Sequence, residues 1–121
     1  MSGILTRNQI LASSVIKRER VNVPAWGGDV WIRELTIAER DRYKVHMMRV
    51  DENGKITPAL DRIAEIRVML VEMAACDDEG QSLFQPGDVA KLGGDSDEAV
   101  EQLSTVAMRL SGLENTEPGK G

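Results

Sequence analysis

Residues that could carry out chemistry are few in this chain, and their spacing matches no catalytic constellation. The chain has one histidine, His46, and one cysteine, Cys76. A nucleophile paired with histidine would have to use His46, and no second imidazole is present to complete a metal site. We expect His46 to be an exposed residue of a helix. Cys76 lies at the end of an apolar helical pattern, so we expect it to pack rather than to react.

Carboxylates and glycines are plentiful, but they do not form a site either. Asp77, Asp78 and Glu79 are consecutive, whereas a calcium loop places its ligands at alternate positions before a distal glutamate. The glycine pairs match neither the phosphate-binding G-x-x-x-x-G-K pattern nor the dinucleotide fingerprint. The sequence therefore predicts no catalytic residues, no metal and no cofactor.

Large apolar side chains are the remaining candidates, and they suit contact with another protein. Trp26 and Trp31 are either interface anchors, as buried indole rings often are, or they close a sheet against the core. Met47 and Met48 suit an adaptable surface that repacks around varied apolar helices, although methionines also fill gaps in a core. Both interpretations stay open for each pair.

Charge and composition limit the class of partner. The formal net charge is -5, and residues 1–76 hold 12 Lys and Arg against 10 Asp and Glu, whereas residues 77–121 hold 3 against 10. An acidic half and 3% aromatic residues argue against nucleic acid and favour a protein partner with a basic surface. Charged residues interrupt the longest apolar run, Ile63 to Cys76, so we expect no membrane span. The lone cysteine and the lack of a signal peptide predict a cytosolic protein.

The stretch from Val21 to Arg40 contains the elements that would position these side chains. Apolar residues alternate with other residues on both sides of a Gly-Gly turn, which predicts a hairpin with one apolar face. That face comprises Val21, Val23, Val30 and Ile32. Pro24 closes the first strand, and Gly27 and Gly28 supply positive φ in the turn. Asp29 is expected to accept hydrogen bonds from nearby backbone amides.

A helix is predicted directly after the hairpin. Thr36 and Glu39 have the spacing of a capping box, in which each side chain bonds to the backbone amide of the other residue. The helix is expected to reach Asp51, where a turn cluster begins. One face is basic and includes Arg40, and the other is apolar at helical spacing; the apolar face comprises Tyr43, Met47 and Val50.

Another helix is predicted to begin at Thr57 and Pro58, as cap and first residue, and to run to about Cys76. Its main apolar stripe comprises Leu60, Ile63, Ile66, Leu70 and Met73. Its centre, Ile63 to Ala75, is apolar nearly all round, so we expect it to be the core helix.

A turn with Gly80 in the left-handed conformation is expected next, followed by a short extended piece that contains Phe84. Two further helices are predicted, a short one opened by Pro86 and a last one that runs from about Ser96 to Gly112. Together these elements predict an α+β fold, an N-terminal β-hairpin packed on a small bundle of four to five helices. One domain is expected over residues 1–113, followed by a disordered polar tail over residues 114–121.

The order of these motifs resembles the tail assembly chaperone family of long-tailed (siphovirus-type) bacteriophages. The hairpin reads V-x-V-P-x-W-G-G-x-V-x-I-R-E-L, T-x-x-E-R follows at once, and D-x-E-G-x-x-L-F comes after the core helix. The resemblance covers most of residues 5–113. The motif positions that carry it include Pro24, Gly27, Gly28, Thr36, Glu39, Arg40, Gly80 and Phe84.

The resemblance implies a protein that is not an enzyme. Members of this family bind the tape measure protein in the host cytoplasm, keep that long helical chain soluble, help to recruit tail tube subunits, and are absent from the mature virion. We place the expected partner surface on the Tyr43, Met47 and Val50 face, with Met48 beside it and Trp26 and Trp31 as anchors. Self-association is a further hypothesis. The alternative function is a small structural tail or neck subunit retained in the virion.

The end of the chain suggests a second product of the gene. The resemblance implies two lengths of protein, the longer made by ribosomal slippage near the end of the shorter. Gly119 and Lys120 can be encoded by a slippery heptamer, so we place the frameshift there as a hypothesis. The tail tube protein would then be recruited through the longer form. A GGC codon for Gly119 would remove this heptamer.

Overall fold

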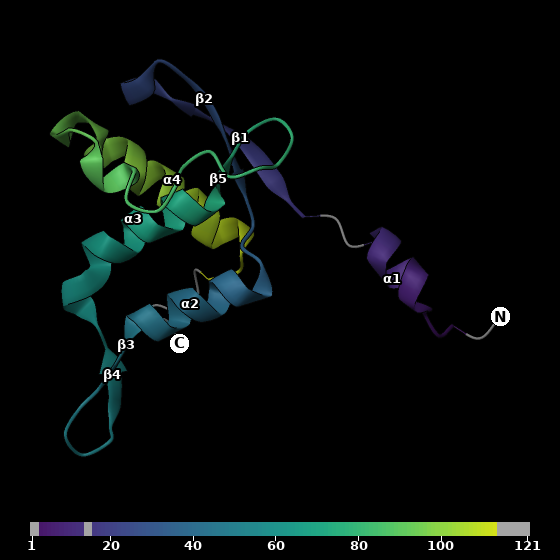
Figure 1. Cartoon of the computed structure of the whole chain (residues 1–121), viewed down its shortest axis with the longest axis horizontal. Coiled ribbons are helices and arrows are strands. Elements are labelled where there is room, and N and C mark those ends of the chain that lie inside the picture. The colour runs from purple at the N-terminus through teal and green to yellow at the C-terminus, as the bar shows by residue number, and fades with distance from the viewer. Residues whose placement is uncertain (1–2, 14–15, 114–121) are drawn as a thin grey trace.

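Helices α2, α3 and α4 lie together with a small sheet across one end in the computed structural model, which describes residues 3–13 and 16–113 (Figure 1). The helices are α1 (Arg7–Ser13), α2 (Ile37–Met47), α3 (Ile63–Ala74) and α4 (Asp97–Leu110). Short 3-10 segments join the elements: η1 (Pro24–Trp26), η2 (Leu60–Arg62), η3 (Val89–Lys91) and η4 (Gly94–Ser96). This mixture confirms the predicted α+β class.

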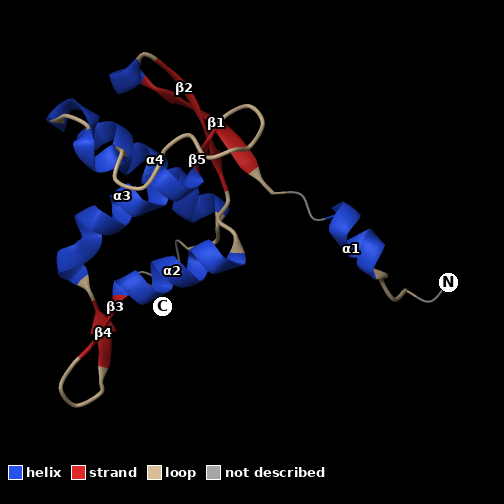
Figure 2. Cartoon of the chain, viewed as in Figure 1, coloured by secondary structure: helices blue, strands red, loops and turns tan. Residues whose placement is uncertain are grey.

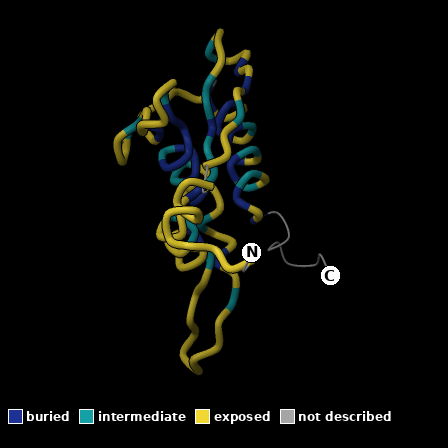
Figure 3. Tube along the Cα trace, turned by 90° about the vertical axis from the view of Figure 1, so that its right-hand side faces the viewer, coloured by how far each residue is buried: buried dark blue, intermediate teal, exposed yellow. Residues whose placement is uncertain are grey.

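The strands form two separate antiparallel sheets (Figure 2). The larger sheet has the order β1-β2-β5 and comprises β1 (Arg18–Val23), β2 (Gly28–Arg33) and β5 (Ala75–Cys76). The smaller sheet is a hairpin made of β3 (Met48–Val50) and β4 (Ile56–Pro58). It extends away from the body, and Figure 3 shows it almost entirely exposed.

The N-terminal hairpin is confirmed with the predicted apolar face. Val21 pairs with Val30 across β1 and β2, and Val23 and Ile32 are fully buried. Gly27 has a φ of 70° after η1, which is the left-handed conformation that the turn requires.

Two details of the predicted turn are wrong. Gly28 is the first residue of β2, paired with Val23, and has no positive φ. Gly28 already belongs to the strand, so Gly27 alone adopts the left-handed conformation in this turn. Asp29 accepts hydrogen bonds from the side chains of Arg20 and Asn22 rather than from backbone amides, because it faces the neighbouring strand instead of the turn.

The third strand of the larger sheet was not predicted. Helix α3 ends at Ala74, and Ala75 and Cys76 pair with Ile32 and Trp31 of β2. The helix prediction was therefore two residues too long, since the sheet offers hydrogen-bond partners for this backbone. The following turn is confirmed: Gly80 has a φ of 83°, and the Leu83 amide returns to the Ala75 carbonyl at 3.0 Å.

The β3–β4 hairpin replaces two predicted helix segments. A continuing helix would bond the Met47 carbonyl to the Asp51 amide. Here the Ala59 amide bonds that carbonyl at 2.8 Å, and the Asp51 amide bonds the Lys55 carbonyl at 2.9 Å. Val50 therefore lies on a strand and not on the helix of Tyr43. Thr57 and Pro58 lie in β4, so the predicted helix start there is wrong by about one and a half turns.

The hydrophobic core lies between α3, α4 and the apolar face of β1 and β2. Its largest fully buried side chains come from all of these elements: Val23, Ile32, Leu35, Leu70, Val71, Cys76 and Leu103. The predicted central position of the α3 helix is thus confirmed over its second half. At its start the prediction is wrong, because Leu60 and Ile63 from the expected core stripe are exposed. The predicted end of α4 is confirmed by Gly112 at a φ of 71° and by the buried Leu113.

Helix α1 has none of its residues buried. Thr6 and Gln9 form a capping box, since the Thr6 amide bonds the Gln9 side chain and the Gln9 amide bonds the Thr6 hydroxyl. Across the described ranges, no helix has the length and apolar character needed to cross a membrane. The predicted tail, residues 114–121, and the proposed frameshift position at Gly119 and Lys120 lie outside the described residues.

Candidate functional site

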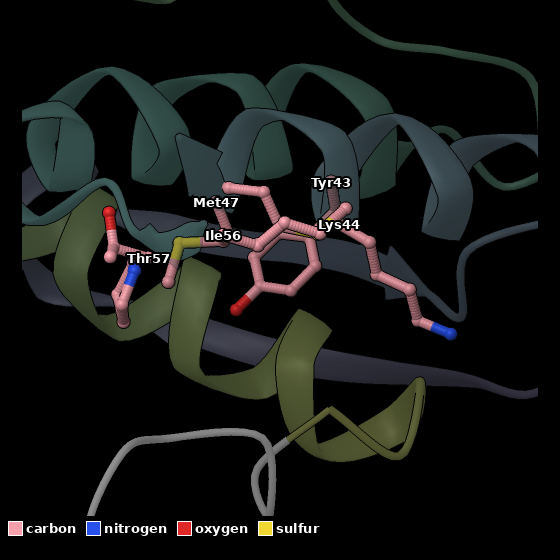
Figure 4. Close-up of a pocket in the computed structure, with 7 residues that line it drawn as sticks. Tyr43, Lys44, Met47, Ile56 and Thr57 are labelled. Atoms are coloured by element: carbon pink, nitrogen blue, oxygen red, sulfur yellow. The ribbon is translucent and has the colours of Figure 1, made fainter. Parts of the chain in front are cut away.

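An open apolar hollow lies where the C-terminal half of α2 meets the β3–β4 hairpin (Figure 4). Its volume is about 400 Å³, which is within the usual range for binding pockets. The hairpin forms one wall because β4 returns beside the end of α2. The lining residues are Tyr43, Lys44, Met47, Met48, Ile56, Thr57 and Pro58.

A second hollow of about 280 Å³ adjoins the first and shares Tyr43 and Met47 with it. It lies between α2, the start of α3 and the middle of α4. Its other lining residues are Leu60, Ile63, Ile66, Arg67, Leu70, Ser104, Thr105 and Met108. We call the two hollows together the apolar cleft.

The predicted partner surface is partly brought together here. Tyr43 is 3% exposed, so its ring forms the floor of the cleft and not a projecting anchor. Met47 is half-buried, and Met48 is 41% exposed at the rim. Val50 is exposed on β3 but lines neither hollow. The binding role of these residues stays a prediction.

Sequence reasoning missed three exposed apolar residues of the cleft. Ile56 and Leu60 are each 61% exposed, and Ile63 is also exposed. The predicted helix starting at Thr57 had assigned Leu60 and Ile63 to the core. An indication was available, because apolar residues flank the polar turn after Val50 on both sides, as they would in a hairpin.

The apolar cleft is free of negative charge among its lining residues. Lys44 lines one hollow and Arg67 the other, and neither hollow has a carboxylate in its lining. Three other hollows on the described part of the molecule each include at least one carboxylate, from Glu39, Glu72, Glu79, Asp97 or Glu101.

An exposed ion pair links the hairpin to η2. Arg49 donates to both carboxylate oxygens of Asp61, at 2.7 and 2.6 Å. The hydrogen bonds from Arg49 hold the pKa of Asp61 below its usual value. The pair joins β3 to η2, and the β4 wall of the cleft is held by its pairing with β3.

Both tryptophans are engaged within the chain, away from the cleft. The half-buried Trp26 donates to the Ser96 hydroxyl at 3.0 Å, and its ring meets Phe84 edge to face at 6.2 Å. Trp31 donates to the Asp78 carboxylate at 2.7 Å, and the Arg18 guanidinium lies 4.3 Å from its ring centroid. These contacts favour the structural interpretation of the two indoles, because each joins the hairpin to a later segment.

The motif residues after the hairpin orient α2. Thr36 and Glu39 form the predicted capping box. Arg33 donates two hydrogen bonds to Glu39, at 2.8 and 2.9 Å, and one to the Met73 carbonyl at 2.7 Å. Burial alone would raise the pKa of Glu39, but the hydrogen bonds from Arg33 and Thr36 outweigh it and lower that pKa. Arg40 donates to the Leu35 carbonyl and to Glu34.

In the part of the chain that the structure describes, the side chains that could carry out chemistry do not form a site. His46 is exposed, with Nδ1 2.9 Å from the Arg42 carbonyl oxygen. Cys76 is buried, and burial raises the pKa of its thiol, against the opposing effect of Arg33 and Arg18. Within the described ranges, no group of three His, Cys, Asp or Glu side chains could hold a metal ion.

Comparison with solved structures shows a likeness in fold to a known protein. No protein-family model matches the chain, and no curated protein matches it. The solved structure of the bacteriophage HK97 tail assembly chaperone aligns with a TM-score of 0.57 and 22% sequence identity, over 85% of this chain and 95% of that one. This is the fold of a phage tail assembly chaperone.

In this tail assembly chaperone fold, the motif residues and the cleft occupy different places. Motif residues such as Gly27, Thr36 and Glu39 form the turn and the capping box that set the hairpin against α2. The cleft is lined by residues of α2, the β3–β4 hairpin, η2, α3 and α4, and none of the motif residues is among them. The resemblance seen in the sequence therefore concerns the scaffold, and the cleft had to be found in the structure.

Proposed function

We propose that this chain is a phage tail assembly chaperone that binds the tape measure protein and keeps it soluble. The observation that carries the proposal is the fold, which matches that of the HK97 tail assembly chaperone over 85% of this chain. The apolar cleft supports it, because a protein that masks an exposed apolar helix needs an accessible apolar surface of its own.

The proposed mechanism is the masking of an aggregation-prone helical stripe. Met47 and Met48 at the cleft have flexible, polarizable side chains that can repack around different apolar partners. Contacts of this kind are numerous and individually weak. Tail tube subunits, recruited with the help of the chaperone, can then displace it. The site of action would be the host cytoplasm, and the chaperone would leave before the virion is complete.

Co-expression tests this function directly. The chain would be expressed with the large helical protein encoded just downstream of it, and the soluble fraction separated by size exclusion. We expect a soluble complex that fails to form when this chain is omitted. An insoluble downstream protein in both cases would overturn the proposal.

Virion composition separates this function from that of a retained tail or neck subunit. A chaperone should be missing from purified particles when their proteins are identified by mass spectrometry. Detection of this chain at a stoichiometry similar to that of tail proteins would favour the retained subunit.

A further inference from the structure

We propose that the apolar cleft takes an amphipathic helix of a partner chain whose apolar stripe is flanked by carboxylates. This inference rests on the proposed function and names the kind of segment that the chaperone would recognise. It concerns the chemistry of one cleft, and so it can fail while the chaperone function holds.

The shape and lining of the cleft favour a helix laid into a groove. Its floor is the buried Tyr43 with the half-buried Met47, and its rim carries the exposed Met48, Ile56 and Leu60. The two hollows are neighbours, since both are lined by Tyr43 and Met47. An amphipathic helix presents apolar side chains at intervals of three and four residues, which suits two neighbouring hollows.

The charges that line the cleft indicate which charged residues should flank the apolar stripe of the bound helix. The chain as a whole is acidic, with a formal net charge of -5, yet the cleft is lined by Lys44 and Arg67 and by no carboxylate. Neither cation takes part in an ion pair within the described residues. Figure 4 shows the Lys44 side chain extending to the side opposite Ile56 and Thr57. Two unpaired cations beside an apolar floor complement an apolar stripe with carboxylates at its edges.

The two ends of this chain have sequences that match this chemistry less well. Residues 1–13 contain Ile and Leu but no carboxylate, and they include Arg7. Residues 114–121 contain Glu114 and Glu117 but no large apolar side chain. Each segment has only one of the two properties, so the occupant that satisfies both belongs to another chain.

Two synthetic helical peptides would test this chemistry on the full chain. Both would carry the same leucine stripe, with glutamates on its flanks in one peptide and lysines in the other. We expect fluorescence anisotropy at low salt to show about tenfold tighter binding of the glutamate peptide. The preference should shrink at high salt, because exposed charges are screened. Equal binding of the two peptides, or tighter binding of the lysine peptide, would overturn the inference.

Matched variants locate the binding in the cleft. Ile56→Asp places a charge on the exposed rim and should weaken glutamate-peptide binding about tenfold. Ile37→Asp is the control, since Ile37 is 81% exposed on α2 and lines neither hollow. Both sites are exposed, so circular dichroism should show both variants folded. Equal effects of the two substitutions would place the binding elsewhere.

A charge reversal gives the sharpest test, because the variant is expected to gain affinity for the lysine peptide. The double variant Lys44→Glu with Arg67→Glu should prefer the lysine peptide. The control double variant, Arg7→Glu with Lys91→Glu, has the same change in net charge away from the cleft and should keep the preference for the glutamate peptide. A reversal in both double variants would mean that net charge, and not the cleft, selects the peptide.

Co-expression with the downstream protein separates the two proposals. Loss of the soluble complex with Ile56→Asp, but not with Ile37→Asp, supports the cleft as the working surface. A complex that survives Ile56→Asp and the Lys44→Glu with Arg67→Glu reversal would overturn the inference and leave the chaperone function standing. A wild-type chain that forms no complex would overturn the proposed function, and the peptide preference would then decide the chemistry of the cleft by itself.

Discussion

Arg33 connects three parts of the molecule through one side chain. It lies on β2, donates two hydrogen bonds to Glu39 on α2, and donates another to the Met73 carbonyl at the end of α3. The side chains of Arg33 and Glu39 are only 12% and 18% exposed. Removing one partner of such a pair leaves the other charge largely cut off from water, which costs more than losing an exposed pair.

Arg33→Ala should therefore lower the free energy of unfolding by about 2 kcal/mol. Arg20→Ala is the matched control, since Arg20 pairs with Asp29 on the same hairpin but its side chain is 67% exposed. We expect no resolvable change from the control, because exposed pairs contribute little. Urea unfolding of both variants measures the difference, and equal losses would show that the Arg33 contacts do not form in solution.

Glu39 should make stability depend on pH. Its pKa is lowered in the folded chain, so its contribution is complete above the unfolded pKa of about 4.3 and is lost as the pH falls through the lower folded value. Glu39→Gln removes that titration. The difference in urea midpoint between wild type and this variant should shrink between pH 7 and pH 3, and a constant difference would contradict the assignment.

Gly27 and Gly28 are neighbours with different backbone requirements. Only Gly27 has a positive φ, and an added Cβ would meet no atom within 4 Å at either position. Gly27→Ala should therefore cost about 1 kcal/mol from backbone strain alone, whereas Gly28→Ala should be neutral or slightly stabilising. Thermal unfolding compares the two, and a larger loss for Gly28→Ala would mean that the turn has a different conformation.

At the scale of elements, two helices begin with the same capping box but differ in their coupling to the core. Thr36 caps α2, which is packed against the body through Tyr43, whereas Thr6 caps α1, which buries nothing. Thr36→Ala should lower the free energy of unfolding by about 1 kcal/mol. Thr6→Ala should reduce helical signal in circular dichroism and leave the unfolding midpoint unchanged. A shift of that midpoint by Thr6→Ala would show that α1 packs on the body.

The elements that were predicted correctly are those specified by residues close together in the sequence. The first hairpin follows from strict alternation, the start of α2 from a capping box, and the end of α4 from a glycine with its following leucine. The strands β3, β4 and β5 have at most three residues each, which is too short for periodicity to show. Residues 43, 47 and 50 fit helical spacing whether or not the helix continues, so only pairing with β4 decides the structure of Val50.

The candidate site was predictable only in part for the same reason. Met47 and Met48 were expected near a partner surface, and they do line the cleft. The wall that completes the cleft comes from β4, which was mistaken for a helix start. The tryptophans could not be assigned because their partners, Ser96 and Asp78, lie 70 and 47 residues away in the chain. Such contacts leave no trace in the local sequence.

At the scale of the whole molecule, the body should be stable without its first helix. The core is made by α2, α3, α4 and the larger sheet, and α1 contributes no buried residue. A variant that lacks residues 1–13 should keep the urea midpoint of the full chain, because removing exposed terminal residues exposes no apolar core. A lowered midpoint would mean that the segment packs on the body in solution.

The position of Cys76 allows its thiol to report the opening of the larger sheet. The chain's single thiol lies on β5, is 2% exposed and pairs with the central strand β2. The thiol lines a hollow beside Arg33 and Glu79 but is almost fully covered, so we expect a thiol reagent to react much faster when β5 separates from β2 or the chain unfolds. The rate at which the thiol is labelled in native buffer would therefore report how often the sheet opens, with no engineered probe. A partner that stabilises the closed sheet on binding would be detected as a slower labelling rate.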